Sequence, residues 1–214
     1  MSDTVSFKPP AVPAEAPLSS LGRRELAKWH DDRAQWVHRA PTLAEMIECL
    51  ALTPLEGVAG FTASTDGRHL FFCPAHSATL TDEARQFLQA HLLWHCLAGH
   101  LTAPLVSDAH CWHLACDHEV NVVLLALDIA LPPDAVLFPI CHGQSARRVY
   151  RWLANHPAPH TETPQDIHPA ALWAYHAVER TSPALATLWQ RRAHLLARET
   201  ATLPPTVTTF CASR

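Results

Sequence analysis

The fold is decided by the stretch HLLWHCLAGH, residues 91–100. This run predicts the end of an α-helix on which His91 and His95 lie about one turn apart on one face. Two imidazoles at this spacing can bind the same metal ion. Gly99 favours a left-handed residue that ends the helix, because glycine has no Cβ to clash there. A helix that ends at Gly99 lets His100 fold back toward the two histidines.

The residues before this stretch predict where its helix begins. Thr81 is a good N-cap, and Asp82 and Glu83 follow in the first turn, where acidic side chains interact favourably with the helix dipole. We expect the helix to run from about residue 82 to residue 98. Its many leucines predict a largely buried helix, so both of its histidines would be buried and would need polar partners.

A second helix, predicted from about residue 107 to residue 127, carries a polar stripe on an otherwise apolar surface. Four side chains form this stripe at positions i, i+3, i+7 and i+11: His110, His113, Asp117 and Asn121. Leaving them unsatisfied in a core is costly, so we expect them to bind one another or an ion. Asp117 is either a third ligand that faces His91 and His95, or a carboxylate that orients one of them. The alternative is a hydrogen-bond network without metal.

A change of hydrophobic period after Gly60 predicts a β-hairpin. Strands are expected at 61–65 and 69–73, joined by Asp66 and Gly67, because Asp-Gly suits a tight hairpin turn. Such a hairpin could border a cleft and pair with an extended peptide, and a purely structural role fits the sequence equally well. The expected fold class is therefore α+β and mainly helical, with a small β-hairpin or sheet beside the metal helix.

The chain is expected to form one domain, at residues 21–200. Residues 1–20, rich in proline, are expected to be a disordered lead, and residues 201–214 a C-terminal tail. Beyond the two helices above, the hydrophobic pattern predicts further helices at about 21–41, 42–50, 149–153, 170–180 and 182–198.

Composition excludes several classes of partner. The formal net charge is -4 and the pI about 6.4, so neither nucleic acid nor an anionic membrane surface is an expected partner. The 7 cysteines are odd in number and form no CxxC pair, which favours a reducing cytoplasm over a disulfide framework. We find no signal peptide and no apolar run long enough to span a bilayer. The chain is expected to be soluble and cytoplasmic.

Together these motifs resemble one family: the predicted metal-dependent peptidase domain that precedes von Willebrand factor A modules in many bacterial proteins. The resemblance covers about residues 42–155 and rests on Thr65-Asp66-Gly67, Pro74, His91, His95, Gly99-His100, Trp112 through Asp117, Asn121, Leu131-Pro132 and residues 145–150. It implies a zincin-like fold with zinc, or another divalent transition metal, on the two helix histidines and an acidic residue of the following helix. No von Willebrand module follows, so we expect the peptidase-like domain alone.

The sequence departs from this family pattern at two positions. Leu92 stands where the zincin helix has the Glu that serves as general base, and His113 stands where Asn is expected after the Trp. Leucine cannot take a proton from metal-bound water, which argues against ordinary peptidase activity. Glu119 is a poor substitute, because it lies two residues after Asp117 and points away from that face of the helix.

Three functions follow from these observations. The first is a zincin-fold pseudo-peptidase that binds zinc and acts as a binding or assembly component with a protein or peptide partner. The second is an active metalloenzyme, a hydrolase or another enzyme, in which His100 or His113 supplies acid–base chemistry and His100, His110 or His113 adds a ligand. The third is a helical scaffold with a buried His/Asp network and no metal. The sequence specifies no substrate and no oligomeric state.

Overall fold

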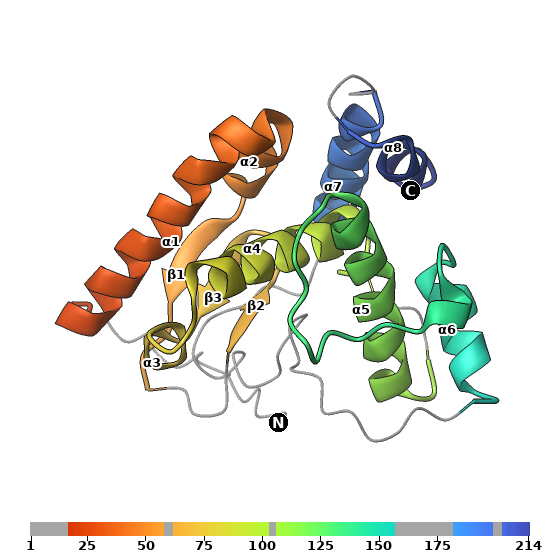
Figure 1. The fold of residues 1–214 in the computed structure, drawn as a ribbon, viewed down its shortest axis with the longest axis horizontal. Coiled ribbons are helices and arrows are strands. Elements are labelled where there is room, and N and C mark those ends of the chain that lie inside the picture. The colour runs from red at the N-terminus through yellow and green to blue at the C-terminus, as the bar shows by residue number, and fades with distance from the viewer. Residues whose placement is uncertain (1–16, 58–61, 103–105, 157–181, 199–202) are drawn as a thin grey trace, which may run out of the picture.

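The computed structural model describes residues 17–57, 62–102, 106–156, 182–198 and 203–214. Its elements are α1 (Ser20–Arg39), α2 (Pro41–Ile47), β1 (Ala51–Pro54), β2 (Ala63–Thr65), β3 (His69–Phe72), α3 (Pro74–Ser77), α4 (Asp82–Leu97), α5 (Ala109–Ala126), the short 3-10 helix η1 (Pro139–Cys141), α6 (Ala146–Leu153), α7 (Pro183–Leu196) and α8 (Pro205–Ala212). Helices dominate and the strands form one small sheet, which confirms the predicted α+β, mainly helical class (Figure 1).

The sheet has β3 at its centre, in the order β1-β3-β2. β2 and β3 are antiparallel, with Thr65 opposite Leu70, which confirms the predicted hairpin. Gly67 takes a φ of 84° in the turn, a conformation that favours glycine. β1 was not predicted: it pairs in parallel with β3, with Leu52 opposite Leu70. Its four residues have no partner nearby in sequence, so only the tertiary fold makes them a strand.

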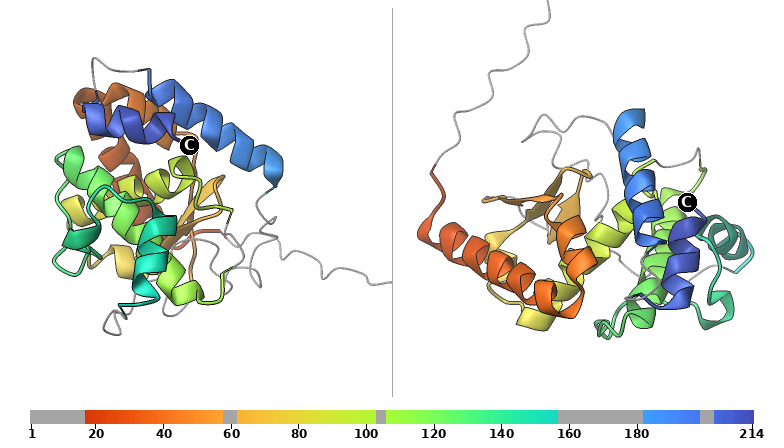
Figure 2. Two further views of the ribbon diagram at one scale, coloured as in Figure 1. Left: turned by 90° about the vertical axis from the view of Figure 1, so that its right-hand side faces the viewer. Right: turned by 90° about the horizontal axis from the view of Figure 1, so that it is seen from above.

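Helix α4 runs through the middle of the molecule. The sheet and α1 lie on one side of it, and α5 and α6 lie on the other (Figures 1 and 2). On the α1 side, Trp29 stacks on Phe72 of β3 with ring centroids 4.5 Å apart. Because α4 is covered on both sides, residues 89–97 are all buried, as the sequence predicted for this helix.

Buried charged and polar side chains fix α4 against α1. Arg85 Nε donates to Asp32 Oδ2 at 2.8 Å, and Arg33 Nε donates to Gln89 Oε1 at 3.0 Å. Arg33 also donates to the carbonyl oxygen of Leu50 at 2.8 Å, so α1 is tied to the chain that leads into β1. Buried charges are tolerated only with good partners, so these directional bonds set the rotation of α4 about its axis. They determine which of its faces is turned toward α5.

The two ends of α4 lie where the sequence placed them. Thr81 caps the first turn through its side-chain oxygen. At the other end Gly99 has a φ of 79°, the Gly99 N–H donates to the carbonyl of Cys96 at 3.2 Å, and the His100 N–H donates to the carbonyl of His95 at 3.0 Å. These two bonds are the Schellman pattern, in which a left-handed residue reverses the chain after a helix. The reversal carries His100 back over the last turn, as predicted.

Helix α5 also agrees with its prediction. Asp108 is the N-cap, and its side chain accepts a hydrogen bond from the backbone N–H of Cys111 at 2.9 Å. The helix contacts α4 along one side and α6 along another. Of its polar stripe, Asp117 and Asn121 are buried, where polar side chains need partners, whereas His110 is exposed and His113 is partly exposed.

The C-terminal part of the chain adds helices that cover α4 and α5. The predicted helix at 182–198 is confirmed by α7, whose Trp189 Nε1 donates to the carbonyl of Gly67 at 2.9 Å. Helix α8 falls within the predicted tail and buries Val207 and Cys211. The expected helix at 170–180 and most of the expected N-terminal lead lie outside the described residues.

None of the helices in the described segments is both long enough and apolar enough to cross a membrane.

Candidate metal centre

Helix α4 places two imidazoles next to each other. Nε2 of His91 and Nε2 of His95 are 2.9 Å apart, and the ring centroids are 4.5 Å apart. His91 is 6% exposed and His95 is 0% exposed. The structure thus brings together the two imidazoles that the sequence placed one turn apart, and it is their Nε2 atoms that face each other.

Helix α5 brings a carboxylate to the same point. Asp117 Oδ1 lies 3.4 Å from His95 Nε2 and 3.9 Å from His91 Nε2. Asp117 is buried, and ligand atoms of the three residues all lie within 4.8 Å of one another. Among the described residues this is the only group of three or more His, Cys, Asp or Glu side chains close enough to hold one ion. We call it the ligand group.

The distances within the ligand group suit a small divalent ion. In a tetrahedral zinc site with bonds of about 2.0–2.1 Å, neighbouring ligand atoms are about 3.3 Å apart. The three separations observed here, 2.9, 3.4 and 3.9 Å, lie on both sides of that value. Imidazole and carboxylate ligands suit zinc and other divalent transition metals. Three protein ligands would leave one tetrahedral position for a further ligand.

The second nitrogen of His91 is held by an amide. His91 Nδ1 lies 3.0 Å from Asn121 Oδ1, and Asn121 Nδ2 donates to the carbonyl of Val136 at 3.1 Å. Because the amide nitrogen is engaged by Val136, the amide oxygen faces the imidazole, and His91 donates through Nδ1. The Nε2 atom then carries no proton and points toward His95 and Asp117, a common arrangement for a metal-bound histidine.

The second nitrogen of His95 meets another histidine. His95 Nδ1 lies 3.0 Å from His100 Nδ1, and His100 Nε2 lies 3.0 Å from Glu119 Oε2. The other oxygen of Glu119 accepts a hydrogen bond from Arg214. Burial lowers the pKa of His100 to about 4. Burial alone would raise the pKa of Glu119, but the hydrogen bond from His100 and the charge of Arg214 lower it to about 2.

The position after the first histidine contributes no polar group. Leu92 is completely buried and belongs to the hydrophobic core. A leucine side chain is a hydrocarbon and has no atom that could accept a proton, so this position cannot supply a general base.

The other histidines singled out from the sequence do not join the ligand group. His100 is buried, but it lies against Nδ1 of His95, on the side of that ring opposite the converging Nε2 atoms. His110 is exposed and His113 is partly exposed, both near the start of α5. Of the predicted polar stripe, only Asp117 and Asn121 reach the α4 histidines.

No local sequence pattern indicated the contact between His100 and Glu119. Glu119 is buried and, as expected, lies away from the ligand group, yet it is connected to His95 through His100. Its outer partner, Arg214, is separated from it by 95 positions in the chain. A charged residue such as Glu119 on an apolar helix indicates weakly that it has a buried partner, but it does not indicate which residue that partner is.

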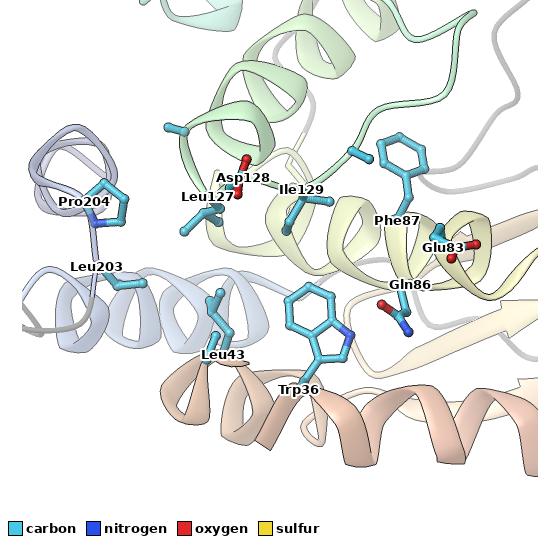
Figure 3. Close-up of a pocket in the computed structure, with 13 residues that line it drawn as sticks. Trp36, Leu43, Glu83, Gln86, Phe87, Leu127, Asp128, Ile129, Leu203 and Pro204 are labelled. Carbon is cyan, nitrogen blue, oxygen red and sulfur yellow. The ribbon is translucent and has the colours of Figure 1, made fainter. Parts of the chain in front are cut away.

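A cavity of about 450 Å³ lies beside the ligand group, between α1, the first turns of α4 and the end of α5 (Figure 3). Its apolar wall includes Trp36, Leu43, Phe87, Leu127, Ile129 and Leu203. Glu83 and Asp128 line it with carboxylates. The ring of Phe87 also packs on His91, with centroids 5.2 Å apart. Phe87 therefore borders both the cavity and the ligand group.

Comparison with known proteins agrees with this geometry. A family model described as "putative metallopeptidase domain" matches residues 26–166, which include the ligand group. Comparison with curated proteins and with solved structures gave no match. Since the family model covers well over half of the chain, the chain belongs to the putative metallopeptidase domain family.

Proposed function

We propose that this protein binds one divalent ion through His91 Nε2, His95 Nε2 and Asp117 Oδ1, and that this ion is zinc. The observation that carries the proposal is the convergence of these three buried atoms from two helices, with separations suited to a tetrahedral ion. Burial adds support, because buried charges in proteins are paired or coordinate a metal, and a carboxylate gathered with two imidazoles away from water suits metal coordination.

We further propose that the protein is a zincin-like pseudo-peptidase. A bound zinc ion would polarise a carbonyl group and acidify a bound water. Proton transfer from that water needs a positioned base, which contributes roughly 10² to 10⁴-fold in rate. Leu92 provides none, and the carboxylate of Glu119 is engaged by His100 and Arg214. The open metal position therefore serves to bind a ligand rather than to cleave it.

The partner that we propose is a polypeptide. Its carbonyl or carboxylate oxygen would take the open metal position, and an apolar side chain beside a Lys or Arg would enter the neighbouring cavity. Support comes from the apolar wall of that cavity and from its two carboxylates, Glu83 and Asp128. A labelled peptide with leucine between two lysines should bind more tightly than the same peptide with two glutamates. Equal binding of both peptides, or no effect of Glu83→Gln with Asp128→Asn, would refute this partner.

Metal analysis tests the ion. Protein purified without a histidine tag should contain about one zinc per chain, and the His91→Ala/His95→Ala variant should contain none. Asp117→Ala should retain the fold and bind zinc more weakly, because one of three ligands is lost. Stoichiometric metal in the double histidine variant would place the ion elsewhere and refute the assignment.

A peptide-cleavage assay tests the loss of catalysis. The wild type with zinc is expected to leave a mixed peptide library intact. Leu92→Glu restores a carboxylate next to His91, and Leu92→Gln is its matched control, because glutamine has the same shape and cannot act as the base. Metal-dependent cleavage by the wild type would defeat the pseudo-peptidase proposal. The active metalloenzyme would then be the better account, and His113→Ala would test whether the partly exposed His113 supplies the proton transfer.

A further inference from the structure

The ligand group is connected to a buried chain of polar groups that runs away from the ion site. His95 Nδ1 lies 3.0 Å from His100 Nδ1, and His100 Nε2 lies 3.0 Å from Glu119 Oε2. Arg214 donates to the second oxygen of Glu119. His95 is 0% exposed, and His100 and Glu119 are each 4% exposed. We call His100 and Glu119 the relay pair.

The position of each proton in this chain follows from the carboxylate of Glu119, which can only accept. Neutral His100 therefore donates through Nε2 to Glu119 and is left with a bare Nδ1 that accepts. His95 must then donate through Nδ1 to His100, which leaves its Nε2 without a proton. Every bond in the series has one donor and one acceptor. The geometry thus selects one tautomer for each ring, and that tautomer of His95 is the one that can bind metal.

The two metal-binding histidines are supported in different ways. His91 donates to the neutral amide of Asn121, whereas His95 is connected through His100 to the charged carboxylate of Glu119. A hydrogen bond to an ionised acceptor is roughly twice as strong as one between neutral groups. In a dry interior this difference is not screened by water.

We infer that His100 and Glu119 are positioning residues for the metal: they hold the ring of His95 in the metal-binding tautomer and orientation and make its Nε2 a stronger ligand. The inference rests on the proposed metal site. Arg214 completes the arrangement, because its guanidinium neutralises Glu119 and packs over the ring of Phe210 in α8. Helix α8 therefore holds the outer end of the chain of polar groups.

A purely structural role for the relay pair is the competing explanation, and His118 provides a matched control. His118 is also a buried residue of α5, next in sequence to Glu119. Its Nε2 lies 3.1 Å from the carbonyl of Cys141, and its Nδ1 accepts from the Phe138 N–H at 3.1 Å. Those bonds hold the loop after α5 and involve no metal-binding residue. His118→Gln should therefore disturb the fold without disturbing the metal.

The experiment compares Glu119→Gln with His118→Gln in the full chain, using Co²⁺ as the probe. Glu119→Gln keeps the shape and removes the charge, so Co²⁺ affinity, measured by competition with a chromogenic chelator, should fall roughly 10 to 100-fold. The visible absorption spectrum of bound Co²⁺ should change as well, because the strength of the His95 ligand changes. His118→Gln should keep the wild-type affinity and spectrum. Glu119→Asp, which keeps the charge on a shorter side chain, should recover part of the loss.

The outcomes separate the two proposals. Wild-type affinity and spectrum in Glu119→Gln would overturn the relay and leave the metal site standing. Equal losses in Glu119→Gln and His118→Gln would also overturn it, since both effects would then be structural. If Glu119→Gln does not fold, Glu119→Asp is compared with the wild type instead. Co²⁺ affinity and spectrum equal to those of the wild type would overturn the inference, and a Co²⁺ affinity below that of the wild type would support it. Failure of the wild type to bind Co²⁺ or Zn²⁺ would refute the metal site, and the relay with it.

Discussion

Removing the ion is expected to lower the free energy of unfolding. The ligand atoms of His91 and His95 come from α4 and that of Asp117 from α5, so the complete ligand group exists only in the folded chain. An ion that binds only the folded state adds about 2.7 kcal/mol when its free concentration is 100 times its Kd. For a chain of this size each kcal/mol raises the melting temperature by roughly 2–4 °C. Zinc at that concentration should therefore raise it by roughly 5–11 °C.

Thermal melts followed by circular dichroism measure this shift. One sample holds zinc at a buffered free concentration, and the other holds excess chelator, with metal content confirmed in both. The chain has 16 histidines, so zinc bound loosely at the surface needs a control. The His91→Gln/Asp117→Asn variant serves as that control, because it keeps the size of both side chains and removes two of the three proposed ligands.

Two results would refute this reasoning. A wild-type midpoint that does not move, although the metal is shown to be gone, would mean that the ion contributes nothing to the folded state. A shift of equal size in the double variant would mean that other histidines bind the zinc. A shift in the wild type alone is the expected outcome.

Three further predictions concern the surrounding fold. Gly99→Ala should lower the free energy of unfolding by about 1–2 kcal/mol, because alanine is strained at a φ of 79° although its Cβ would meet nothing within 4 Å. A denaturant titration measures this change, and an unchanged midpoint would contradict it. Arg85→Ala should lower the free energy of unfolding by about 3–5 kcal/mol, since it leaves the buried carboxylate of Asp32 without its Nε donor. Adding Asp32→Ala to this variant should recover part of the lost stability, because the buried charge is then gone. Burial alone would raise the pKa of Asp66, but hydrogen bonds from His69 lower it below the ordinary pKa of about 3.9. The ionised carboxylate therefore contributes its full stabilisation at any pH above the ordinary pKa, and this stabilisation is lost as the pH falls through the lowered pKa of the folded chain. Melts at falling pH should show a weaker acid destabilisation in Asp66→Asn than in the wild type, and identical pH dependence would count against the assignment.

The elements around the ligand group could be predicted because their signals are local. The Thr81 cap, the Gly99 stop and the histidines one turn apart all depend on residues within a few positions of one another. The Asp66-Gly67 turn is local in the same way, since its left-handed position needs glycine. Strand β1 could not be predicted, because it pairs in parallel with β3 and no tight turn joins the two strands, so no local signal marks the pairing.

By itself, the sequence determined which face of α4 carries His91 and His95, and that a polar stripe lies on the following helix. Helical periodicity is sufficient for that, because it fixes the relative directions of side chains on one helix. Only the tertiary structure decided which members of the stripe reach the two histidines: Asp117 does, whereas His113 does not. It alone joined His100 to Glu119, since contacts between separate elements depend on how helices pack and rotate against one another, which no local pattern encodes.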